Sequence, residues 1–551
     1  MESESLPETP DLEGAFPRLS EEQISRLAKY GTRRPTQAGQ VLYREGEEFG
    51  DFFVILEGKV MVIEDYEGAA KIVYVHGPGR FLGELGLLTG QKAFLTNVVI
   101  EPGEVLAVPV PQLRALVAQD SVLGDLILRA YIIRRALLIE TGSGFRLIGS
   151  RYSPGTRRLR EFAARNRLPC HWIDLEEDEN AETLLRRLGV SPEETPVVVL
   201  GGTQVLRNPS NAEVARAIGL PATVSRETLC DLVVVGAGPA GLAASVYGAS
   251  EGLTTITLDA IATGGQAATA SRIENYLGFP AGITGAELAE RAVLQANKFG
   301  ARFSVPAEAS SLGERDGAHA IGLADGTSVL ARSVIIATGA RYRRPDVPRL
   351  EEFEGTSVFY AATLSEALVC QNDPVVVVGG GNSAGQATLF LAGHAARVHL
   401  LVRNGDLNKE MSRYLVDQVE RHPGVEIMVH TEVRELVGQD GALEAVVAED
   451  NRTGERKTIE AKALFVFIGA APHTQWLADT LALDDRGFIL TGDTDGCSSM
   501  LLETSRPGIF AAGDVRSGSI KRVASAVGEG SMAVRLVHEH LEKEGARTSV
   551  S

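Results

Sequence analysis

Three patterns of hydrophobic positions follow one another along the first 220 residues. Between Val41 and Val75 short apolar runs alternate with turn residues, a pattern typical of a small β-roll or barrel. From Val110 to Ile139 the apolar residues recur at helical spacing, which predicts helices that close the roll. A β-α-β-α-β-α pattern between Phe145 and Ile218 then predicts a small α/β domain.

Two further apolar runs each lead into a glycine loop. Leu232–Val235 precedes Gly236-Ala-Gly-Pro-Ala-Gly241, and Val375–Val378 precedes Gly379-Gly-Gly-Asn-Ser-Ala384. In such loops the first glycine permits a tight turn, the second lets the backbone approach a pyrophosphate, and the third packs a helix against the strand. The helix N-terminus then faces the negative charge. The loops predict two Rossmann-like dinucleotide-binding domains.

After each loop the next strand is followed by a charged residue, and the two residues have opposite charges. Asp259 follows Thr255–Leu258, at about the 20-residue spacing of an acceptor for ribose hydroxyls. Arg403 follows Val398–Val402, and a positive residue there suits the additional phosphate of NADP. The two sites are therefore expected to hold different dinucleotides.

Composition narrows the class of protein. The 551 residues allow three to four domains, and 44% hydrophobic with 23% charged residues is typical of a globular chain. The net charge of −18 argues against nucleic-acid binding. A polar, acidic N-terminus, no long apolar run, and four cysteines without C-x-x-C or metal spacing predict a cytoplasmic protein with no metal site and no membrane partner.

The segment from Ala38 to Pro109 resembles cyclic-nucleotide-binding domains. Gly39, Gly46 and Gly58 match the glycine framework of that family, and Phe81–Leu88 matches its phosphate-binding cassette. The resemblance implies that the cassette residues Gly83 and Glu84 contact a cyclic nucleotide, with Glu84 accepting from its ribose hydroxyl.

An arginine should follow the cassette glutamate by nine or ten positions and pair with the cyclic phosphate, but none is present there. Lys92 lies one step early and lacks the planar fork of arginine. Two interpretations stay open. Either Gly83, Glu84 and Lys92 bind a cyclic nucleotide, or the domain keeps its fold without a ligand and mediates packing.

The α/β segment resembles glutaredoxin- or thioredoxin-like domains, with Thr195-Pro196 where that family carries its cis-proline and Gly201-Gly202 after it. The position of the redox C-x-x-C reads Ser153-Pro-Gly-Thr156. Disulfide exchange requires a thiolate, so this module is expected to be redox-inactive and to serve as a docking surface or spacer.

Residues 228–545 resemble low-molecular-weight thioredoxin reductases, because Val334–Gly339 and Gly508–Asp514 accompany the two glycine loops. The resemblance implies FAD, NADPH or NADH, a homodimer, and two nucleotide domains that rotate relative to each other. The expected organisation is a cyclic-nucleotide-binding-like β-roll with helices (15–142), a thioredoxin-like α/β domain (143–222), an FAD domain in two parts (228–341 and 466–545) and an NAD(P)H domain (342–465).

The resemblance also assigns cofactor contacts. For FAD it implies Gly236, Ala237, Gly238, Pro239, Ala240, Gly241, Asp259, Gly264, Gly265, Gln266, Asn275, Thr338, Gly339, Gly513, Asp514, Arg522, Val523 and Ala524. For NADPH it implies Gly379, Gly381, Asn382, Ser383, Ala384 and Arg403. Asn404 and Asn408 replace basic residues of the family, which weakens the expected preference for NADPH, although Lys409 is nearby.

The redox dithiol of that family has no counterpart in the matching stretch Val358–Glu366. Ala361 and Leu364 occupy the two cysteine positions, and Ser365 replaces the neighbouring acid. Cys370 and Cys497 are expected to be isolated thiols. No catalytic side chain is therefore predicted at this position.

These observations predict an FAD-dependent NAD(P)H oxidoreductase in which hydride passes from the nicotinamide to FAD and then to an external acceptor, a small molecule or a protein. The N-terminal domain is a candidate regulator. One alternative is a thioredoxin-disulfide reductase that uses remote cysteines. The other is a non-enzymatic, nucleotide-sensing regulator.

Overall fold

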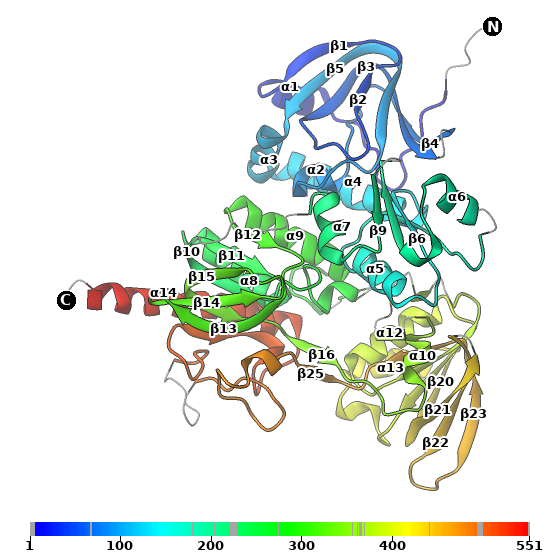
Figure 1. Ribbon diagram of the computed structural model, residues 1–551, viewed down its shortest axis with the longest axis vertical. Coiled ribbons are helices and arrows are strands. Elements are labelled where there is room, and N and C mark those ends of the chain that lie inside the picture. Colours follow the sequence, from blue (N-terminus) through cyan, green and yellow to red (C-terminus); the bar gives the residue numbers. More distant parts are fainter. Residues whose placement is uncertain are drawn as a thin grey trace. The chain divides into compact units, whose positions relative to one another are not determined.

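The structure is a computed structural model. It describes residues 6–548 apart from 67–68, 179–180, 202–203, 221–228, 271, 274, 355, 361, 363–365, 368–369, 440 and 493–499. The chain divides into two compact units, Met1–Val224 with Asn297–Ala307, and Ser225–Ala296 with Glu308–Ser551. Figure 1 labels their helices and strands.

A β-roll forms the first part of the N-terminal unit. Strand β5 pairs antiparallel with β1, β2 and β3, and β3 pairs antiparallel with β4. The strands are β1 (Thr32–Thr36), β2 (Val41–Tyr43), β3 (Asp51–Tyr66), β4 (Ala69–His76) and β5 (Thr96–Pro109). The helices are α1 (Glu21–Ala28), α2 (Leu85–Thr89), α3 (Val110–Gln119) and α4 (Ser121–Glu140).

The β-roll agrees with the predicted class, but several elements differ from the hydrophobic pattern. The runs on either side of Gly58 form one strand, because Gly58 has φ 85° and lets the strand continue through an irregular register against β5. Strands β1 and β5 were not predicted. The single helical run is broken at Asp120, whose carboxylate accepts hydrogen bonds from Val122 and Leu123 N–H and so starts α4.

The second part of this unit is an α/β domain with strand order β7-β6-β8-β9. Strands β6 and β7 are parallel, whereas β8 runs antiparallel to both β6 and β9. The elements are β6 (Phe145–Ile148), α5 (Pro154–Arg165), β7 (Cys170–Ile173), α6 (Ala181–Arg187), β8 (Val197–Leu200), β9 (Gln204–Arg207) and α7 (Asn211–Ala217). The sequence pattern missed β9, a short strand with exposed ends.

Helix α5 begins at Pro154, and the Ser153 hydroxyl caps it by accepting from Thr156 N–H. The Thr195-Pro196 peptide is cis, as expected. Gly202 lies outside the described residues.

The two N-terminal domains share a core. Phe94, from the loop that follows α2, is 4% exposed and packs with the buried residues of the α/β domain, among them Phe145 and Phe162. Beside it, Lys92 N–H donates to Ile218 O (3.0 Å) and Gly144 N–H donates to the Glu64 carboxylate (3.1 Å). The cassette loop is thus part of a domain junction.

The sheet that carries the first glycine loop forms the centre of one C-terminal domain. Strands β11, β10 and β15 lie side by side and parallel, β26 adds to β15, and β14 and β13 continue the sheet antiparallel. Its elements are β10 (Leu229–Val235), α8 (Pro239–Ser250), β11 (Thr255–Leu258), α9 (Gly285–Lys298), β13 (Ala309–Arg315), β14 (Ala318–Leu323), β15 (Ser328–Ile336), β26 (Ile509–Ala511) and α14 (Val523–Thr548). Helices α8 and α14 lie against this sheet (Figure 1).

The second glycine loop belongs to a parallel sheet of order β17-β24-β18-β19-β20, accompanied by the antiparallel meander β21-β22-β23. Its elements are α10 (Leu350–Phe353), β17 (Val358–Phe359), β18 (Pro374–Val378), α12 (Asn382–Ala392), β19 (Arg397–Val402), α13 (Arg413–Arg421), β20 (Val425–Val429), β21 (Thr431–Gln439), β22 (Ala442–Asp450), β23 (Arg456–Glu460) and β24 (Ala463–Val466). Both predicted Rossmann-like sheets are therefore observed.

Two chain crossings connect the nucleotide domains of the C-terminal unit. Strand β16 (Ala340–Tyr342) pairs antiparallel with β25 (Ala470–Pro472), and Arg343 N–H donates to Gly469 O at 2.8 Å. Within the described residues, no helix is long and apolar enough to span a membrane.

The shared core predicts that Phe94→Ala destabilises the N-terminal unit by about 3–5 kcal/mol, the usual cost of removing a buried phenylalanine side chain. Urea unfolding followed by Trp172 fluorescence, in a Trp476→Phe background, measures this change. Ile72→Ala is the matched control, because Ile72 is 46% exposed and its truncation should cost little. Equal midpoints for Phe94→Ala and the parent protein would contradict the shared core.

Candidate functional site

The first glycine loop places no side chain over the N-terminus of α8. Gly236 has φ 106°, and a Cβ there would lie 2.3 Å from Ala337 O. A Cβ on Gly241 would lie 1.8 Å from Gly236 O, so the close approach of α8 to β10 requires glycine. Gly238 caps α8 in an extended conformation, and the nearest protein atom to its Cβ position is Gly265 Cα at 3.9 Å. The space above Gly238 is open to a ligand.

Asp259 ties the glycine loop to the turn after β11. One carboxylate oxygen accepts from Ala237 N–H (2.8 Å), and the other accepts from Ile261 and Ala262 N–H (2.9 and 3.0 Å). Each carboxylate oxygen can accept more than one hydrogen bond. The structure therefore gives Asp259 a role in shaping the loop, beside the predicted contact with a ribose.

A second loop packs directly on the first. Gly264 N–H donates to Ala237 O (2.6 Å), and a Cβ on Gly265 would lie 2.9 Å from Gly238 Cα. Gln266 donates its side-chain amide to Ala340 O. These three residues lie together with the glycine loop, whereas Asn275 is solvent-exposed.

The C-terminal Gly-Asp pair also reaches the start of α8. A Cβ on Gly513 would lie 3.0 Å from Ala240 Cβ, and Gly513 N–H donates to the Glu529 carboxylate (2.7 Å). Burial raises the pKa of Asp514, with a smaller opposing effect from Lys521. Among the described residues its carboxylate has no hydrogen-bond donor, so it is available to the hydroxyl groups of a ligand.

The remaining residues predicted for this site lie at strand and helix ends. Thr338 and Gly339 are half-buried after β15, and the Thr338 hydroxyl donates to His473 O (3.4 Å). Arg522 precedes α14, which begins with the half-buried Val523 and the exposed Ala524. Glycines at a helix N-terminus and the half-buried carboxylate of Asp514 fit the pyrophosphate and hydroxyl groups of a dinucleotide.

The second glycine loop repeats this geometry. Gly379 has φ 146°, and a Cβ there would lie 2.4 Å from Phe467 O and 3.1 Å from Ala384 Cβ. Gly381 caps α12, and the Asn382 side chain accepts from Ser412 N–H (2.6 Å). Ser383 in the first turn of α12 is exposed. The helix N-terminus is again open to a phosphate.

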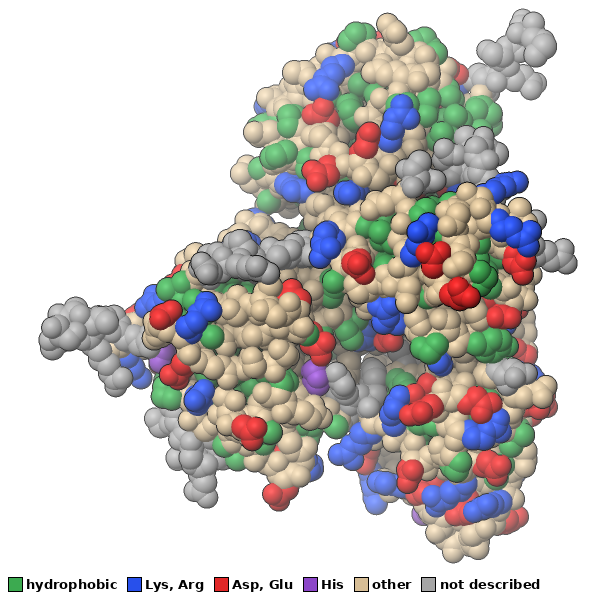
Figure 2. Space-filling view, in the orientation of Figure 1, with side chains coloured by type: hydrophobic (Ala, Val, Ile, Leu, Met, Phe, Trp, Pro, Cys, Tyr) green, Lys and Arg blue, Asp and Glu red, His purple; other side chains and the backbone are tan. Residues whose placement is uncertain are grey.

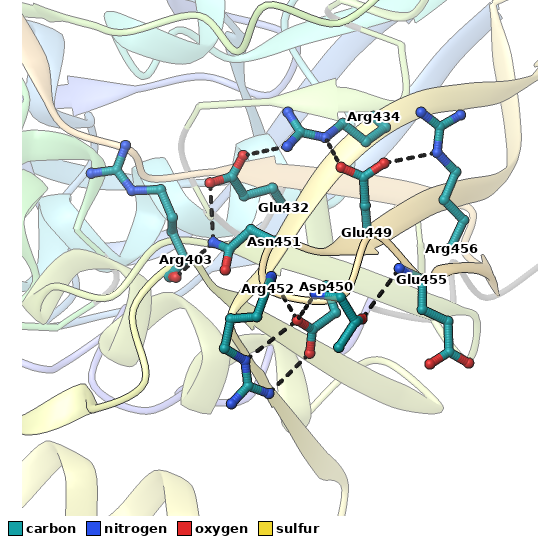
Figure 3. Close-up of polar contacts among 10 residues, drawn as sticks. Arg403, Glu432, Arg434, Glu449, Asp450, Asn451, Arg452, Glu455 and Arg456 are labelled. Carbon is teal, nitrogen blue, oxygen red and sulfur yellow. Dashed lines mark hydrogen bonds and ion pairs between the residues drawn. The ribbon is translucent and has the colours of Figure 1, made fainter.

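Arg403 lies at the end of β19, next to this loop. Its backbone oxygen accepts from the Asn451 amide (3.1 Å), and its guanidinium points away from the neighbouring ion pairs (Figure 3). The nearby arginines differ, since Arg434 and Arg456 both contact Glu449 (3.0 and 2.8 Å). In the part of the chain that the structure describes, Arg403 has no carboxylate within 4.0 Å. It is therefore available to an additional phosphate.

The surface around Arg403 carries both charge signs. Basic and acidic side chains alternate over the region of β20 to β23 (Figure 2). The Arg434–Glu432 and Arg452–Asp450 pairs (3.0 and 3.1 Å) belong to this region. Mixed charges of this kind do not form the basic surface that nucleic-acid binding requires.

The cassette of the β-roll differs from the expected arrangement. Arg135 of α4, which the sequence analysis missed, donates to the Glu84 carboxylate (2.5 and 2.9 Å) and to the Gln91 side chain (2.9 Å). Glu84 also caps α2 by accepting from Gly86 N–H (2.9 Å). Both ion-pair partners are buried, so Glu84 is held by protein groups within the unit.

The other two cassette residues are also engaged within the unit. Gly83 has φ 99°, and a Cβ there would lie 2.8 Å from the Tyr131 hydroxyl. The Lys92 side chain lies against Gly219, where a glycine Cβ would come within 3.2 Å of Lys92 Cγ. A pair of arginines within the apolar run of α4 is the sequence signal that could have identified Arg135.

The described cysteines do not form a redox pair. Cys170, Cys230 and Cys370 are free thiols, in β7, in β10 and in the core of the second nucleotide domain. Burial raises the pKa of Cys370 to about 11 and that of Cys170 to about 12. Ala361, Leu364, Ser365 and Cys497 lie outside the described residues.

Comparison with known proteins adds to this geometry. A family model described as pyridine nucleotide-disulphide oxidoreductase matches residues 230–530, more than half of the chain. The chain belongs to the pyridine nucleotide-disulphide oxidoreductase family. A second model, the cyclic nucleotide-binding domain, matches residues 33–120 and agrees with the β-roll. Members of the oxidoreductase family are enzymes, and this disfavours a purely sensory role.

Relatives within the oxidoreductase family are named thioredoxin reductases. The chain is 34% identical to the protein of Treponema pallidum, over 57% of this chain and 98% of that one. It is 31% identical to that of Mycoplasmopsis pulmonis, over 58% and 100%. The solved thioredoxin reductases of T. acidophilum and Lactococcus lactis align at TM-score 0.53, with 32% and 27% identity, over 57% of this chain and 99% of theirs.

The open space at Gly238 predicts that Gly238→Ala folds but loses bound flavin, because the methyl group occupies the path of the pyrophosphate. The flavin-to-protein absorbance ratio of the purified variant should fall at least tenfold. Gly313→Ala in β13 is the control, since nothing lies within 4 Å of its Cβ position. Full flavin content in Gly238→Ala would contradict the assigned loop.

The free guanidinium of Arg403 predicts that Arg403→Gln raises KM for NADPH about tenfold and leaves KM for NADH unchanged. Steady-state kinetics with both nucleotides measures this difference. Arg397→Gln is the control, because Arg397 lies at the start of the same strand and pairs with Glu426. An equal loss with NADH would show that Arg403 does not read the additional phosphate.

Proposed function

We propose that the protein is an FAD-dependent NAD(P)H oxidoreductase without an internal dithiol, whose electrons leave directly for an external acceptor. The observation that carries the proposal is the combination of two open dinucleotide loops with alanine and leucine at the dithiol positions, Ala361 and Leu364. When bound, FAD takes hydride from the nicotinamide and delivers electrons to an acceptor.

The chain's own groups support the positions of the two nucleotides. Gly238 and the N-terminus of α8 would receive the FAD pyrophosphate, and Asp514 would accept hydroxyl groups of the flavin chain. Gly381 and α12 would receive the pyrophosphate of NAD(P)H, and Arg403 the additional phosphate of NADPH. NADPH is therefore the proposed reductant.

The chemistry of the thiols favours the dithiol-free mechanism over a thioredoxin-disulfide reductase with remote cysteines. Disulfide exchange begins with a thiolate. Cys370 is 1% exposed, its thiol donates to Glu366 O (3.2 Å), and its pKa of about 11 keeps it protonated at neutral pH. Cys230 is equally buried, within β10. Neither thiol has the environment of a nucleophile.

We propose a structural role for the N-terminal unit. The buried Glu84–Arg135 pair supports a cassette that has exchanged its cyclic nucleotide for internal packing. The strand order of the second domain and the helix that starts after Ser153 support a thioredoxin-like module without the redox C-x-x-C. The family resemblance supports a homodimer, and the four scattered cysteines support a cytoplasmic location.

Anaerobic stopped-flow mixing with NADPH and with NADH tests the proposed function. The yellow flavin absorbance should disappear rapidly, faster at low concentrations of NADPH than of NADH. Quinones, ferredoxin, a flavodoxin-like protein, an external disulfide and oxygen are then offered to the reduced protein. Flavin that stays oxidised with both nucleotides would refute the oxidoreductase assignment for this chain.

The buried environment of Cys370 predicts that Cys370→Ala leaves flavin reduction and acceptor turnover within about twofold of the parent protein. Cys230→Ala is the matched control, because its thiol is buried to the same extent in the other nucleotide domain. Loss of disulfide-substrate reduction in Cys370→Ala alone would instead support the remote-cysteine reductase.

A further inference from the structure

The β-roll and α4 line a small, partly open cavity that the proposed oxidoreductase function does not use. Its volume is about 30 Å³. Its lining comes from β2, β3, β4, β5, the cassette and α4, and includes Tyr74, His76, Asn97 and Arg134. A space of this size holds roughly two water-sized groups, whereas pockets for nucleotide-sized ligands measure several hundred Å³.

Five buried polar atoms in this lining have no hydrogen-bond partner among the described residues. They are the hydroxyls of Tyr43 and Tyr74, His76 Nδ1, Asn97 Oδ1 and Arg134 Nη2. His76, Asn97 and Arg134 are 2–3% exposed. Buried polar groups are nearly always paired, so five such atoms around one cavity indicate a polar ligand that completes them.

Arg134 sets the charge of that ligand. Its Nε donates to Ala15 O (2.7 Å) and its Nη1 to Gly83 O (2.8 Å), which leaves Nη2 for the cavity. Its guanidinium carbon lies 4.6 Å from the centre of the Phe81 ring and 5.2 Å from that of Phe16. The side chain is therefore fixed by its surroundings before any ligand arrives.

The charge of Arg134 lacks an acidic partner. No carboxylate of the described chain lies within 4.0 Å of its guanidinium, and the neighbouring Glu84 is engaged by Arg135. Burial and the nearby Arg134 hold the pKa of His76 well below its usual range, so the imidazole is neutral. A buried charge without a counterion is costly, and one negative charge in the cavity would balance it.

We propose that this cavity binds a compact monovalent oxyanion, of the size of formate, nitrate or bicarbonate, against Arg134 Nη2. The Tyr74 hydroxyl and the neutral His76 ring supply further hydrogen bonds to its oxygens. Asn97 can present its NH₂ group to the same ligand, because the two orientations of an amide differ by a half-turn. The site is independent of the flavin chemistry. Its positive charge comes from an arginine of α4, whereas the expected phosphate-binding arginine would follow the cassette glutamate.

Titration calorimetry on the full-length protein tests this proposal. Formate and acetate form the carboxylate series, nitrate and bicarbonate the inorganic series, and cyclic AMP represents a nucleotide, all at constant ionic strength. We expect saturable binding of at least one compact anion and none of cyclic AMP. Which series binds identifies the source of the ligand.

Two variants locate the site. Arg134→Met should abolish anion binding, and Tyr74→Phe, which keeps the ring and removes one donor, should raise Kd about tenfold. Tyr30→Phe is the matched control, because Tyr30 is 45% exposed on the same domain, and its Kd should equal that of the parent protein. If Arg134→Met does not fold, Tyr74→Phe decides.

Three outcomes would overturn the proposal. The first is the absence of binding by every compact anion at concentrations up to the ionic strength of the buffer. The second is an unchanged Kd in Tyr74→Phe. The third is tight binding of cyclic AMP that the compact anions do not displace, because the cavity would then admit a nucleotide.

Discussion

The approach of helix α8 to the central sheet is the constraint on which the C-terminal unit depends. The helix comes so close to β10 that a methyl group on Gly241 would lie 1.8 Å from Gly236 O, and a Cβ on Gly530 of α14 would lie 2.1 Å from Ala240 O. This packing brings the turn at Gly236, the loop at Gly265 and the Gly513-Asp514 pair to one helix N-terminus. The phosphate-binding geometry is thus a product of close backbone packing.

Both nucleotide domains depend on a glycine loop that lets a helix pack close to a strand. The residues that follow the next strand, β11 in one domain and β19 in the other, distinguish the two sites. At the first site Asp259 is drawn into the loop by three backbone donors. At the second site, the backbone oxygen of Arg403 accepts a hydrogen bond from the Asn451 amide, and its guanidinium has no carboxylate partner among the described residues. One architecture therefore presents a carboxylate in one domain and an open positive charge in the other.

The sequence predicted the parts of the fold that depend on neighbouring residues. A valine run followed by spaced glycines specifies a strand, a tight turn and a helix within about 15 residues. Both nucleotide loops could therefore be predicted from the sequence. The partner of Glu84 in the cassette was missed, because Arg135 lies 51 positions away on a helix whose sequence is a largely apolar run. Only the folded roll brings these charges together.

The predicted boundaries of some helices and strands were wrong for a related reason. Gly58 resembles a turn in the sequence, but the register of β5 carries β3 through it, and Asp120 divides a helical run that has uninterrupted apolar periodicity. Long-range pairing and a single capping side chain decided these boundaries. That Ala361 and Leu364 occupy the positions expected to carry the dithiol is, in contrast, a property of residue identity and needed no structure.

In the proposed mechanism the flavin is the last redox centre within this chain. Anaerobic reductive titration with NADPH, combined with thiol counting by a chromogenic disulfide before and after reduction, tests this mechanism. We expect full reduction by about one equivalent of NADPH per flavin with no new reactive thiols. Uptake of about two equivalents per flavin, accompanied by two additional thiols, would contradict it.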